Sequence, residues 1–310
     1  MTIFCPLSGS FNVELIEKIG TKDIIKIYEE LLGLNISSEL YRIEEIGFYY
    51  CRESNLRFFH PAVTGSESFY EKLQKFDWYY LDDKAEYACA SQFIKESDSV
   101  LEIGSGKGAF AKKIKTQRYV GLEFSQEAQR LASMNGISIL SESIQDHAIA
   151  HPEKYDVVCS FQVLEHVADL NSFIKASVEC LKPGGILIYS VPSADSFISL
   201  TKNNILNMPP HHISWFSDIC LEYIGEKFNL KAINIIHEKV ADIHKEWYAS
   251  SIVFESLSNL LGSKFSLVER SIKYKILSKL AQRAGWFVAK GLSDERSLPI
   301  GHSVTVIYEK

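Results

Sequence analysis

Gly104, Gly106 and Gly108 directly follow a short apolar run at residues 100–103. An apolar run bounded by a turn signal predicts a buried strand. Glycine has no Cβ atom, so this spacing permits a sharp turn and brings backbone N–H groups against a ligand, and we expect a helix to begin there and to cover residues 109–115. The pattern predicts a loop that cradles a nucleotide.

Two acidic residues beside the loop, Glu102 and Glu123, indicate which nucleotide it prefers. Glu123 lies about twenty residues beyond the first glycine, where a carboxylate can accept hydrogen bonds from both ribose hydroxyls. Gly104, Gly106 and Ala109 also fit a GxGxxA fingerprint, so a nicotinamide-dependent oxidoreductase is an alternative. Glu102 argues against it, because a carboxylate before the loop repels a pyrophosphate. S-adenosylmethionine is cationic and has no phosphate, so the same carboxylate would attract it instead of repelling it.

Four motifs occur in order along the chain: VLEIGSGKG, YVGLEFS, YDVVCSFQVLEHV and LKPGGILIYSVPS. This series resembles that of class I S-adenosylmethionine-dependent methyltransferases, and it is most similar to the branch that contains the ubiquinone-biosynthesis O-methyltransferases. The resemblance covers residues 84–193. It implies an enzyme that uses S-adenosylmethionine, releases S-adenosylhomocysteine and methylates a small molecule. We favour a hydroxyl of a sugar, phenol or secondary metabolite, with nitrogen and carbon acceptors open. A cofactor-binding module without catalysis is also consistent with the loop.

The resemblance assigns cofactor contacts to residues in and after successive strands of the predicted sheet. Gln162 is expected at the amino-acid end of the cofactor, and Ile144 is either an adenine contact or a plain core residue. The complete expected set is Glu102, Gly104, Ser105, Gly106, Gly108, Glu123, Phe124, Ser143, Ile144, Gln162 and Leu164.

Adjacent histidines in the segment MPPHHISWFS are the candidates for acid–base chemistry. Related methyltransferases have a similar PPHH segment along the acceptor pocket. Methyl transfer is an in-line displacement, so the protein must align the acceptor and take up its proton. Histidine titrates near neutral pH, and we expect His211 or His212 to be the general base, with His166 behind them. Alternatively, the pair is simply exposed or helix-capping, or the acceptor needs no base.

Strand and helix patterns alternate as βαβαβαβαβ up to residue 191, which predicts an α/β, doubly wound sheet. The resemblance makes this the Rossmann-like, seven-stranded methyltransferase sheet, with the last strand at residues 302–308 inserted antiparallel. We expect a small α+β accessory region at residues 1–80 and the methyltransferase domain at residues 81–310. The domain includes a helical insertion or cap at residues 241–295, before the last strand. The accessory region either packs against the catalytic domain or forms an oligomer contact, so a homodimer is an alternative.

The six cysteines include two that resemble the knuckles of a zinc ribbon, Cys5-Pro-Leu-Ser and Cys51-Arg-Glu-Ser. In each knuckle a serine, Ser8 or Ser54, replaces the second cysteine. Two thiolates cannot close a four-ligand zinc site, so we expect no metal there and two ordinary part-buried cysteines. No CxxC pair occurs, and disulfides are not expected.

Composition limits the partners and the location. The chain of 310 residues has a formal net charge of −6, which argues against nucleic acid as the main partner. Neither a signal peptide nor an apolar run of membrane-spanning length is recognisable, so we expect a cytoplasmic protein.

Residues 271–290 are basic without a single acid and carry apolar residues at helical spacing. The expected apolar face consists of Ile276, Leu277, Leu280, Ala284, Phe287 and Val288. Such a helix either rests on an anionic membrane or docks on the protein core with a solvated basic flank. We favour the docked helix in an otherwise acidic chain.

Overall fold

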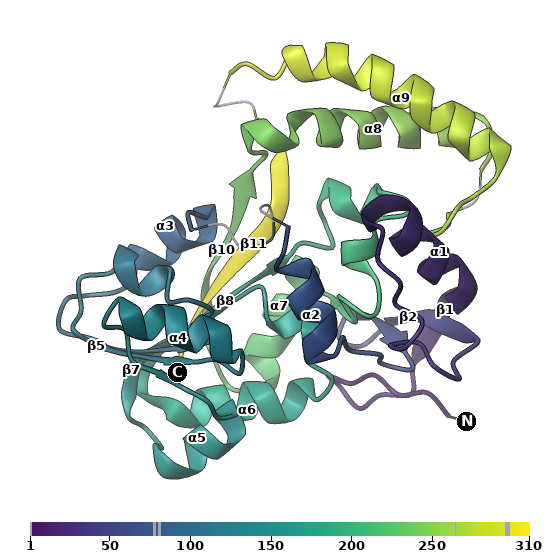
Figure 1. Ribbon diagram of the computed structural model, residues 1–310. Coiled ribbons are helices and arrows are strands. Elements are labelled where there is room, and N and C mark those ends of the chain that lie inside the picture. The colour runs from purple at the N-terminus through teal and green to yellow at the C-terminus, as the bar shows by residue number, and fades with distance from the viewer. Residues whose placement is uncertain (1, 77–78, 80–81, 264, 295–297) are drawn as a thin grey trace.

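The computed structural model describes residues 2–76, 79, 82–263, 265–294 and 298–310, and it is built around a seven-stranded sheet (Figure 1). The strand order is β10-β11-β8-β7-β4-β5-β6. β4 to β8 pair in parallel, and β11 pairs antiparallel with both β8 and β10, which confirms the expected fold class. The strands are β4 (Ser99–Ile103), β5 (Arg118–Leu122), β6 (Ile139–Leu140), β7 (Tyr155–Phe161), β8 (Leu181–Pro192), β10 (Lys231–Lys239) and β11 (Ile300–Glu309).

Helices flank this sheet, and polar side chains mark where several of them begin. Ser125, Asp169 and Ser217 each accept a hydrogen bond from a backbone N–H in the first turn of the helix that follows. Each of these first turns thus has a partner for one of its otherwise unpaired N–H groups. The helices are α3 (Ala85–Ser91), α4 (Gln126–Met134), α5 (Ile144–Ala150), α6 (Leu170–Cys180) and α7 (Asp218–Lys227).

The expected helix at residues 109–115 does not form, so this prediction was wrong. The chain forms only a short 3-10 helix, η1 (Phe110–Lys113), before it turns into extended backbone. Phe110 is fully buried against the rings of Tyr87 and Phe161, and the Thr116 hydroxyl donates to the carbonyl of Asp98 at 2.6 Å. These anchors leave too few residues for a longer helix before β5 begins.

A second sheet joins the N-terminal region to a later segment of the chain. Its order is β1 (Val13–Gly20), β2 (Glu45–Cys51), β3 (Arg57–His60) and β9 (Ser214–Trp215), all antiparallel. β9 belongs to the segment that carries the adjacent histidines. α1 (Thr21–Leu32) and α2 (Glu67–Leu73) complete this part of the molecule. The accessory region therefore shares a sheet with residues 214–215 of the following part of the chain, and the boundary expected at residues 80 and 81 falls outside the described residues.

The two degenerate knuckles lie together in the structure. Cys5 Sγ is 3.3 Å from Ser54 Oγ, and Ser8 Oγ is 3.4 Å from Cys51 Sγ. Both cysteines are fully buried, which corrects the expectation that they are only part-buried. Each serine thus forms a hydrogen bond with a cysteine of the opposite knuckle. The expectation that this place holds no zinc stays a prediction.

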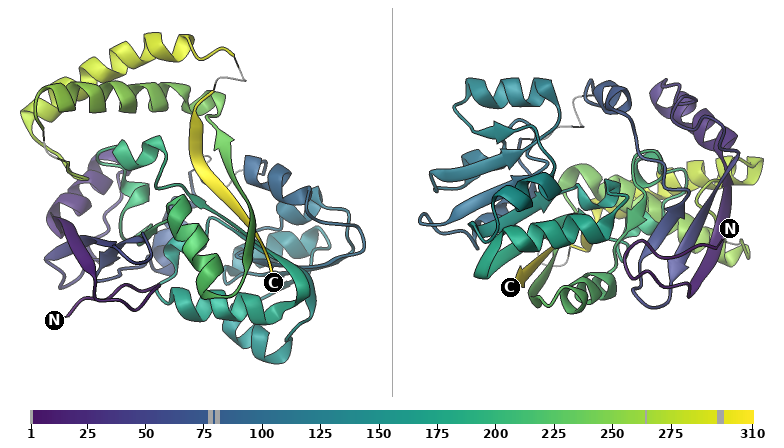
Figure 2. Two further views of the ribbon diagram at one scale, coloured as in Figure 1. Left: turned by 180° about the vertical axis from the view of Figure 1, so that it is seen from behind. Right: turned by 90° about the horizontal axis from the view of Figure 1, so that it is seen from below.

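α8 (Lys245–Leu260) and α9 (Ile272–Lys290) run side by side as a hairpin, seen at the top of Figure 1 and from behind in Figure 2. α9 buries one narrow stripe of mostly small residues, and at Gly285 a Cβ atom would lie only 2.5 Å from Ser250 Oγ. Most of the expected apolar face is exposed instead: Ile276, Leu280, Ala284, Phe287 and Val288. Docking of that face on the core was therefore a wrong expectation, because α9 packs on α8 through its small residues.

Contact of residues 271–290 with a membrane surface stays a prediction, as does a homodimer. Within the part of the chain that the structure describes, no helix combines the length and the apolar character needed to cross a bilayer.

Candidate active site

The glycine loop after β4 has a backbone that only glycine suits. Gly104, Gly106 and Gly108 all have positive φ, at 73°, 52° and 76°. A Cβ atom on Gly104 would lie 2.4 Å from Cγ2 of Val163, and one on Gly108 would lie 2.7 Å from Cδ1 of Ile137. Both conformation and space thus require glycine at these two positions.

Glu123 follows β5 and holds the loop from the side. Its Oε2 accepts the N–H of Gly106 at 3.0 Å, and its Oε1 accepts the N–H of Ser125 at 2.8 Å. Each carboxylate oxygen can accept about two hydrogen bonds, so acceptor capacity remains on both. The half-buried carboxylate is suited to bind two neighbouring hydroxyls, as the sequence predicted for a ribose.

Glu102 differs from the expectation. Its side chain is fully buried in β4, and the Tyr119 hydroxyl donates to its Oε2. Burial raises the pKa of Glu102 to about 8, so the carboxyl is mostly protonated at neutral pH. The assumed full negative charge was wrong, and the electrostatic argument from this residue against a diphosphate is correspondingly weaker.

Three other expected cofactor residues lie along the same edge of the sheet. Ser105 is buried beneath the loop, with its Oγ 3.5 Å from the Leu122 carbonyl. Phe124, just past β5, is 65% exposed. Ser143 begins α5 and accepts the N–H of Asp146 at 3.0 Å. Of the three, the ring of Phe124 is the most exposed, and Ser143 is half-buried.

Ile144, Leu164 and Gln162 are positioned differently. The side chains of Ile144 and Leu164 pack in the core, which favours the interpretation of Ile144 as a plain core residue. Gln162 follows β7 with a positive φ of 57°, and its Nε2 donates to Ser303 Oγ at 3.2 Å. A non-glycine residue in this conformation is uncommon and is held here by its neighbours.

The structure brings the three candidate histidines together. His166 ends η2 (Leu164–His166), directly after β7, whereas His211 and His212 precede β9. The ring centroids are 4.7 Å apart for His166 and His211, 4.8 Å for His166 and His212, and 4.4 Å for the adjacent pair. We call these residues the histidine cluster. His211 and His212 are buried, so the alternative of a simply exposed pair is wrong.

Oxygen acceptors fix the protonation of each ring. Nδ1 of His166 donates to the carbonyl of His211 at 2.6 Å, and Nδ1 of His211 donates to the carbonyl of Leu206 at 2.9 Å. Nδ1 of His212 lies 3.3 Å from Oδ1 of Asn207. Carbonyl oxygens only accept, so the proton of each neutral ring is on Nδ1 and the lone pair is on Nε2.

Glu165 lies against the histidine cluster and was missed by the sequence analysis. Its Oε1 is 3.7 Å from Nε2 of His212 and 3.9 Å from Nε2 of His166. The carboxyl is fully buried, and neither oxygen has a hydrogen-bond partner among the described residues. Its position between two motif residues in LEHV was the one available signal.

Burial makes this site electrically neutral. It raises the pKa of Glu165 to about 8, lowers the pKa of His166 to about 4, and lowers the pKa of His211 and His212 well below the ordinary value. The imidazoles are therefore free bases at neutral pH. They can accept a proton, although the lowered pKa makes them weak bases.

Comparison with known proteins decides the family. A family model described as a methyltransferase domain matches residues 71–235, which is more than half of the chain. The chain belongs to this family. The match, together with the fold, makes it a class I S-adenosylmethionine-dependent methyltransferase.

The relatives of this methyltransferase agree with that assignment. The ubiquinone biosynthesis O-methyltransferase of Serratia proteamaculans is 31% identical over 100 residues, covering 30% of this chain and 42% of the relative. The enzyme of that name from Klebsiella pneumoniae is 33% identical over 99 residues, covering 29% and 41%. This chain thus spans about two fifths of the length of the curated relatives it matches.

A solved structure supports the fold of the methyltransferase. A SAM-dependent methyltransferase from Archaeoglobus fulgidus superimposes with a TM-score of 0.51 at 15% identity. The match covers 78% of this chain and 100% of that one, which shows the shared fold.

The glycine loop of the methyltransferase fits an adenosine cofactor. The loop has no side chain at Gly104 and Gly108 that would fill it, and Glu123 presents acceptor capacity beside it. Val163, which contacts Gly104 and stands three residues before His166, connects the loop to the histidine cluster along one edge of the sheet.

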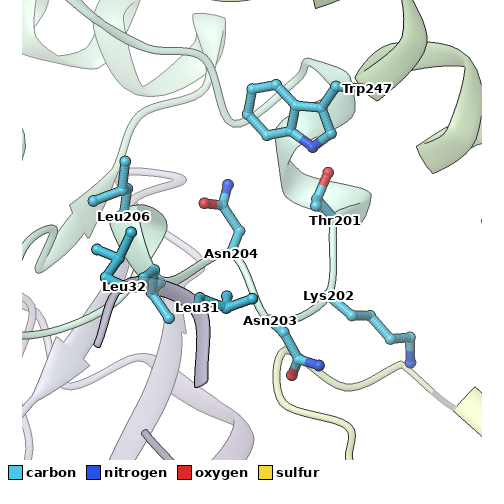
Figure 3. A pocket seen from close by; sticks show the side chains of 9 residues that line it. Leu31, Leu32, Thr201, Lys202, Asn203, Asn204, Leu206 and Trp247 are labelled. Carbon is cyan, nitrogen blue, oxygen red and sulfur yellow. The ribbon is translucent and has the colours of Figure 1, made fainter. Parts of the chain in front are cut away.

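A pocket of about 330 Å³ is lined in part by residues 201–206, the segment that precedes the histidines (Figure 3). Leu206, whose carbonyl accepts from His211, is part of its wall. Lys202 donates to Ser266 Oγ at 2.9 Å and Asn203 donates to the Glu269 carbonyl at 2.8 Å. These polar groups hold the segment against residues 265–271, so we assign the pocket a structural role. Its lining is Leu31, Leu32, Thr201, Lys202, Asn203, Asn204, Ile205, Leu206 and Trp247.

The histidine cluster predicts a measurable pH effect on stability. A histidine whose folded pKa is lowered stabilises the fold fully above the unfolded pKa of about 6.5, and this stability is lost as the pH falls toward the folded pKa. Glu102 and Glu165, with raised pKa, act in the opposite direction: their contribution is lost as the pH rises through about 8. Only a comparison of variants isolates the histidines.

We therefore expect His212→Gln to lose less unfolding free energy than the wild type when the pH falls from 7.5 to 5.5. Urea unfolding followed by circular dichroism at both pH values measures the difference. Equal losses in the two proteins would contradict the lowered pKa of His212.

Proposed function

We propose that the methyltransferase transfers the methyl group of S-adenosylmethionine to a hydroxyl of a small molecule, such as a sugar, phenol or secondary metabolite. The observation that carries the proposal is the convergence of three free-base imidazoles at the sheet edge that also carries the glycine loop. Relatives named as O-methyltransferases support the choice of a hydroxyl.

The loop and Glu123 would hold the cofactor, which supplies an electrophilic methyl group when it is bound. Glu123 orients the ribose through its two oxygens, and the open backbone at Gly104 and Gly106 lets the adenosine approach. Phe124 is the exposed aromatic ring beside Glu123 and is suited to cover the adenine.

The histidine cluster would receive the acceptor proton. A hydroxyl must lose its proton as it attacks, and an imidazole Nε2 with a free lone pair can take it up. We propose His211 or His212 for this role, with His166 supporting them. Glu165 lies 3.7 Å from Nε2 of His212, so a positive charge formed on that ring would favour ionisation of the neighbouring carboxyl, whose negative charge would then balance it.

A cytoplasmic location and a small-molecule acceptor rather than nucleic acid are also part of the proposal. The six cysteines are all free thiols in the structure, as a reducing compartment would allow. The net charge of −6 does not favour binding to phosphate backbones.

Ligand binding tests the cofactor part of the proposal first. We expect S-adenosylmethionine and S-adenosylhomocysteine to raise the melting temperature, because a ligand at 100 times its Kd adds about 2.7 kcal/mol of stability. NAD and NADP, tested at the same concentration, should have no effect. Stabilisation by NAD alone would instead support the oxidoreductase alternative.

Turnover tests the acceptor. Methyl-labelled S-adenosylmethionine is incubated with phenols and sugars, each paired with the analogue that lacks one hydroxyl. Label on the hydroxyl compound and not on its deoxy partner is the expected result. Cofactor binding without transfer to any acceptor, including cell extract, would favour the non-catalytic binding module.

A further inference from the structure

We propose that His166, His211, His212 and Glu165 bind one divalent transition-metal ion of the Zn²⁺ class. One ring nitrogen of each histidine lies within 4.8 Å of the corresponding nitrogens of the other two. The Oε1 atom of Glu165 lies within 4 Å of Nε2 of both His166 and His212. Three nitrogen donors and one carboxylate oxygen thus converge from two segments that are far apart in the sequence. The sequence analysis expected no metal, so this proposal departs from it.

The tautomers of the three rings suit metal ligation. A metal-bound histidine almost always donates its other ring N–H to a carbonyl or carboxylate oxygen, which fixes the tautomer and directs the lone pair. Here the Nδ1–H groups of His166 and His211 donate to main-chain carbonyls, and that of His212 faces Oδ1 of Asn207. The Nε2 atoms of His166 and His212 consequently face Glu165, whereas Nε2 of His211 lies 3.2 Å from the Tyr79 hydroxyl, which a metal ion would have to displace.

Glu165 supplies an independent argument. A buried carboxyl without a hydrogen-bond partner is costly, and the great majority of buried polar groups have one. Both oxygens of Glu165 are buried and have no partner among the described residues, and Oε1 faces the Nε2 atoms of two rings that carry no proton there. A cation bound between them would give the carboxylate and the lone pairs their partner at once.

The donor set selects the class of metal. Imidazole nitrogens suit Zn²⁺, Fe²⁺, Co²⁺ and Ni²⁺, whereas Mg²⁺ and Ca²⁺ prefer sites made of oxygen atoms. Around Zn²⁺, with bonds of about 2.0–2.1 Å, tetrahedral ligand atoms lie roughly 3.3 Å apart. Binding would therefore draw the nitrogens together by about an ångström or more, through rotation of the side chains. The knuckle residues Cys5 and Cys51 offer only two thiolates and make a poorer site.

A metal ion here would change how the acceptor is activated. Bound to the ion, a hydroxyl loses its proton more readily, because the ion lowers its pKa. This would remove the need for a strong base beside the acceptor. This role rests on the proposed function, whereas metal binding itself does not.

Metal binding is tested on the full chain without reference to activity. The purified protein is dialysed against a chelator, titrated with Zn²⁺ or Co²⁺, and analysed by inductively coupled plasma mass spectrometry and by the visible absorption of Co²⁺. We expect one ion per chain. Glu165→Gln should lower the affinity by on the order of tenfold or more, and Asn207→Ala, which removes only the acceptor beside His212, by about 10- to 100-fold.

Controls separate this site from other sources of metal. The double variant Cys5→Ser and Cys51→Ser should keep the ion, and circular dichroism with S-adenosylhomocysteine binding confirms that each variant is folded. No stoichiometric ion in the folded wild type, or an ion lost only in the cysteine variant, would overturn the proposal. Full turnover of the metal-free protein would overturn the activating role and leave the proposed methyl transfer intact.

Discussion

Replacement of Glu123 by alanine is expected to weaken the binding of S-adenosylmethionine by about 100- to 1,000-fold. A hydrogen bond to a charged group contributes roughly 1.5–3 kcal/mol, and two ribose hydroxyls would lose theirs. A total of about 3–4 kcal/mol corresponds to that factor, since 1.4 kcal/mol is tenfold. The variant also frees the N–H groups of Gly106 and Ser125, which Glu123 now accepts, so the loop itself loses an anchor.

A matched control removes the same charge nearby. Glu127 lies one residue into α4 and is exposed, where it pairs with Arg130 at 2.7 Å. Glu127→Ala should leave the affinity unchanged, because an exposed ion pair contributes little. Isothermal titration calorimetry with S-adenosylhomocysteine measures both variants. Equal losses in the two would show that only net charge matters, and an unaltered Glu123→Ala would remove this residue from the site.

The sheet and the cofactor loop were predictable because their signals are local. Glycines at alternate positions have few uses other than a tight turn, and the structure gives all three a positive φ. Apolar runs bounded by glycine or charged residues marked β4 and β7, and Ser125 and Asp169 begin their helices as expected. The order of the strands and the antiparallel position of β11 came from the resemblance to known methyltransferases, since local patterns do not specify them.

Features that depend on tertiary contact were not predictable. β9 has only two residues and pairs with a strand more than 150 positions earlier, so no periodicity reveals it. The raised pKa of Glu102 follows from its burial, and the sequence alone does not show that this glutamate is buried. The exposure of Phe287 on α9 depends on the close packing that Gly285 permits against α8.

Glu165 shows the same limit at the active site. Its neighbours His166 and His212 were identified separately, from two motifs, and nothing in the sequence measures how closely these motifs approach. The N–H of Ile213 donates to the main-chain carbonyl of Glu165 at 2.9 Å and joins the two segments. This contact and the hydrogen bond from His166 Nδ1 to the carbonyl of His211 bring three candidate bases into one site.

Replacement of both His211 and His212 by alanine is expected to lower kcat by about 10²- to 10⁴-fold, the usual contribution of a positioned general base. The substitution removes the rings both as proton acceptors and as ligands of a metal ion, so kcat is expected to fall for either role. Affinity for S-adenosylhomocysteine should stay within about twofold of the wild type, because the glycine loop and Glu123 lie on other segments. Initial rates with labelled cofactor, together with calorimetric binding, measure the two quantities separately.

A control variant and a second substitution keep this prediction sharp. His151→Ala removes a histidine at the end of α5, outside the histidine cluster, and should retain full turnover. Because His211 and His212 are buried, His211→Gln and His212→Gln are made as well, and circular dichroism verifies that every variant is folded. Added Zn²⁺ then separates the two roles. If the substituted histidine is a metal ligand, Zn²⁺ should partly restore the turnover of the single glutamine variant. If it is the base, Zn²⁺ should not restore turnover. Undiminished turnover in the folded double variant would exclude both histidines from the mechanism and would point to an acceptor that is already nucleophilic.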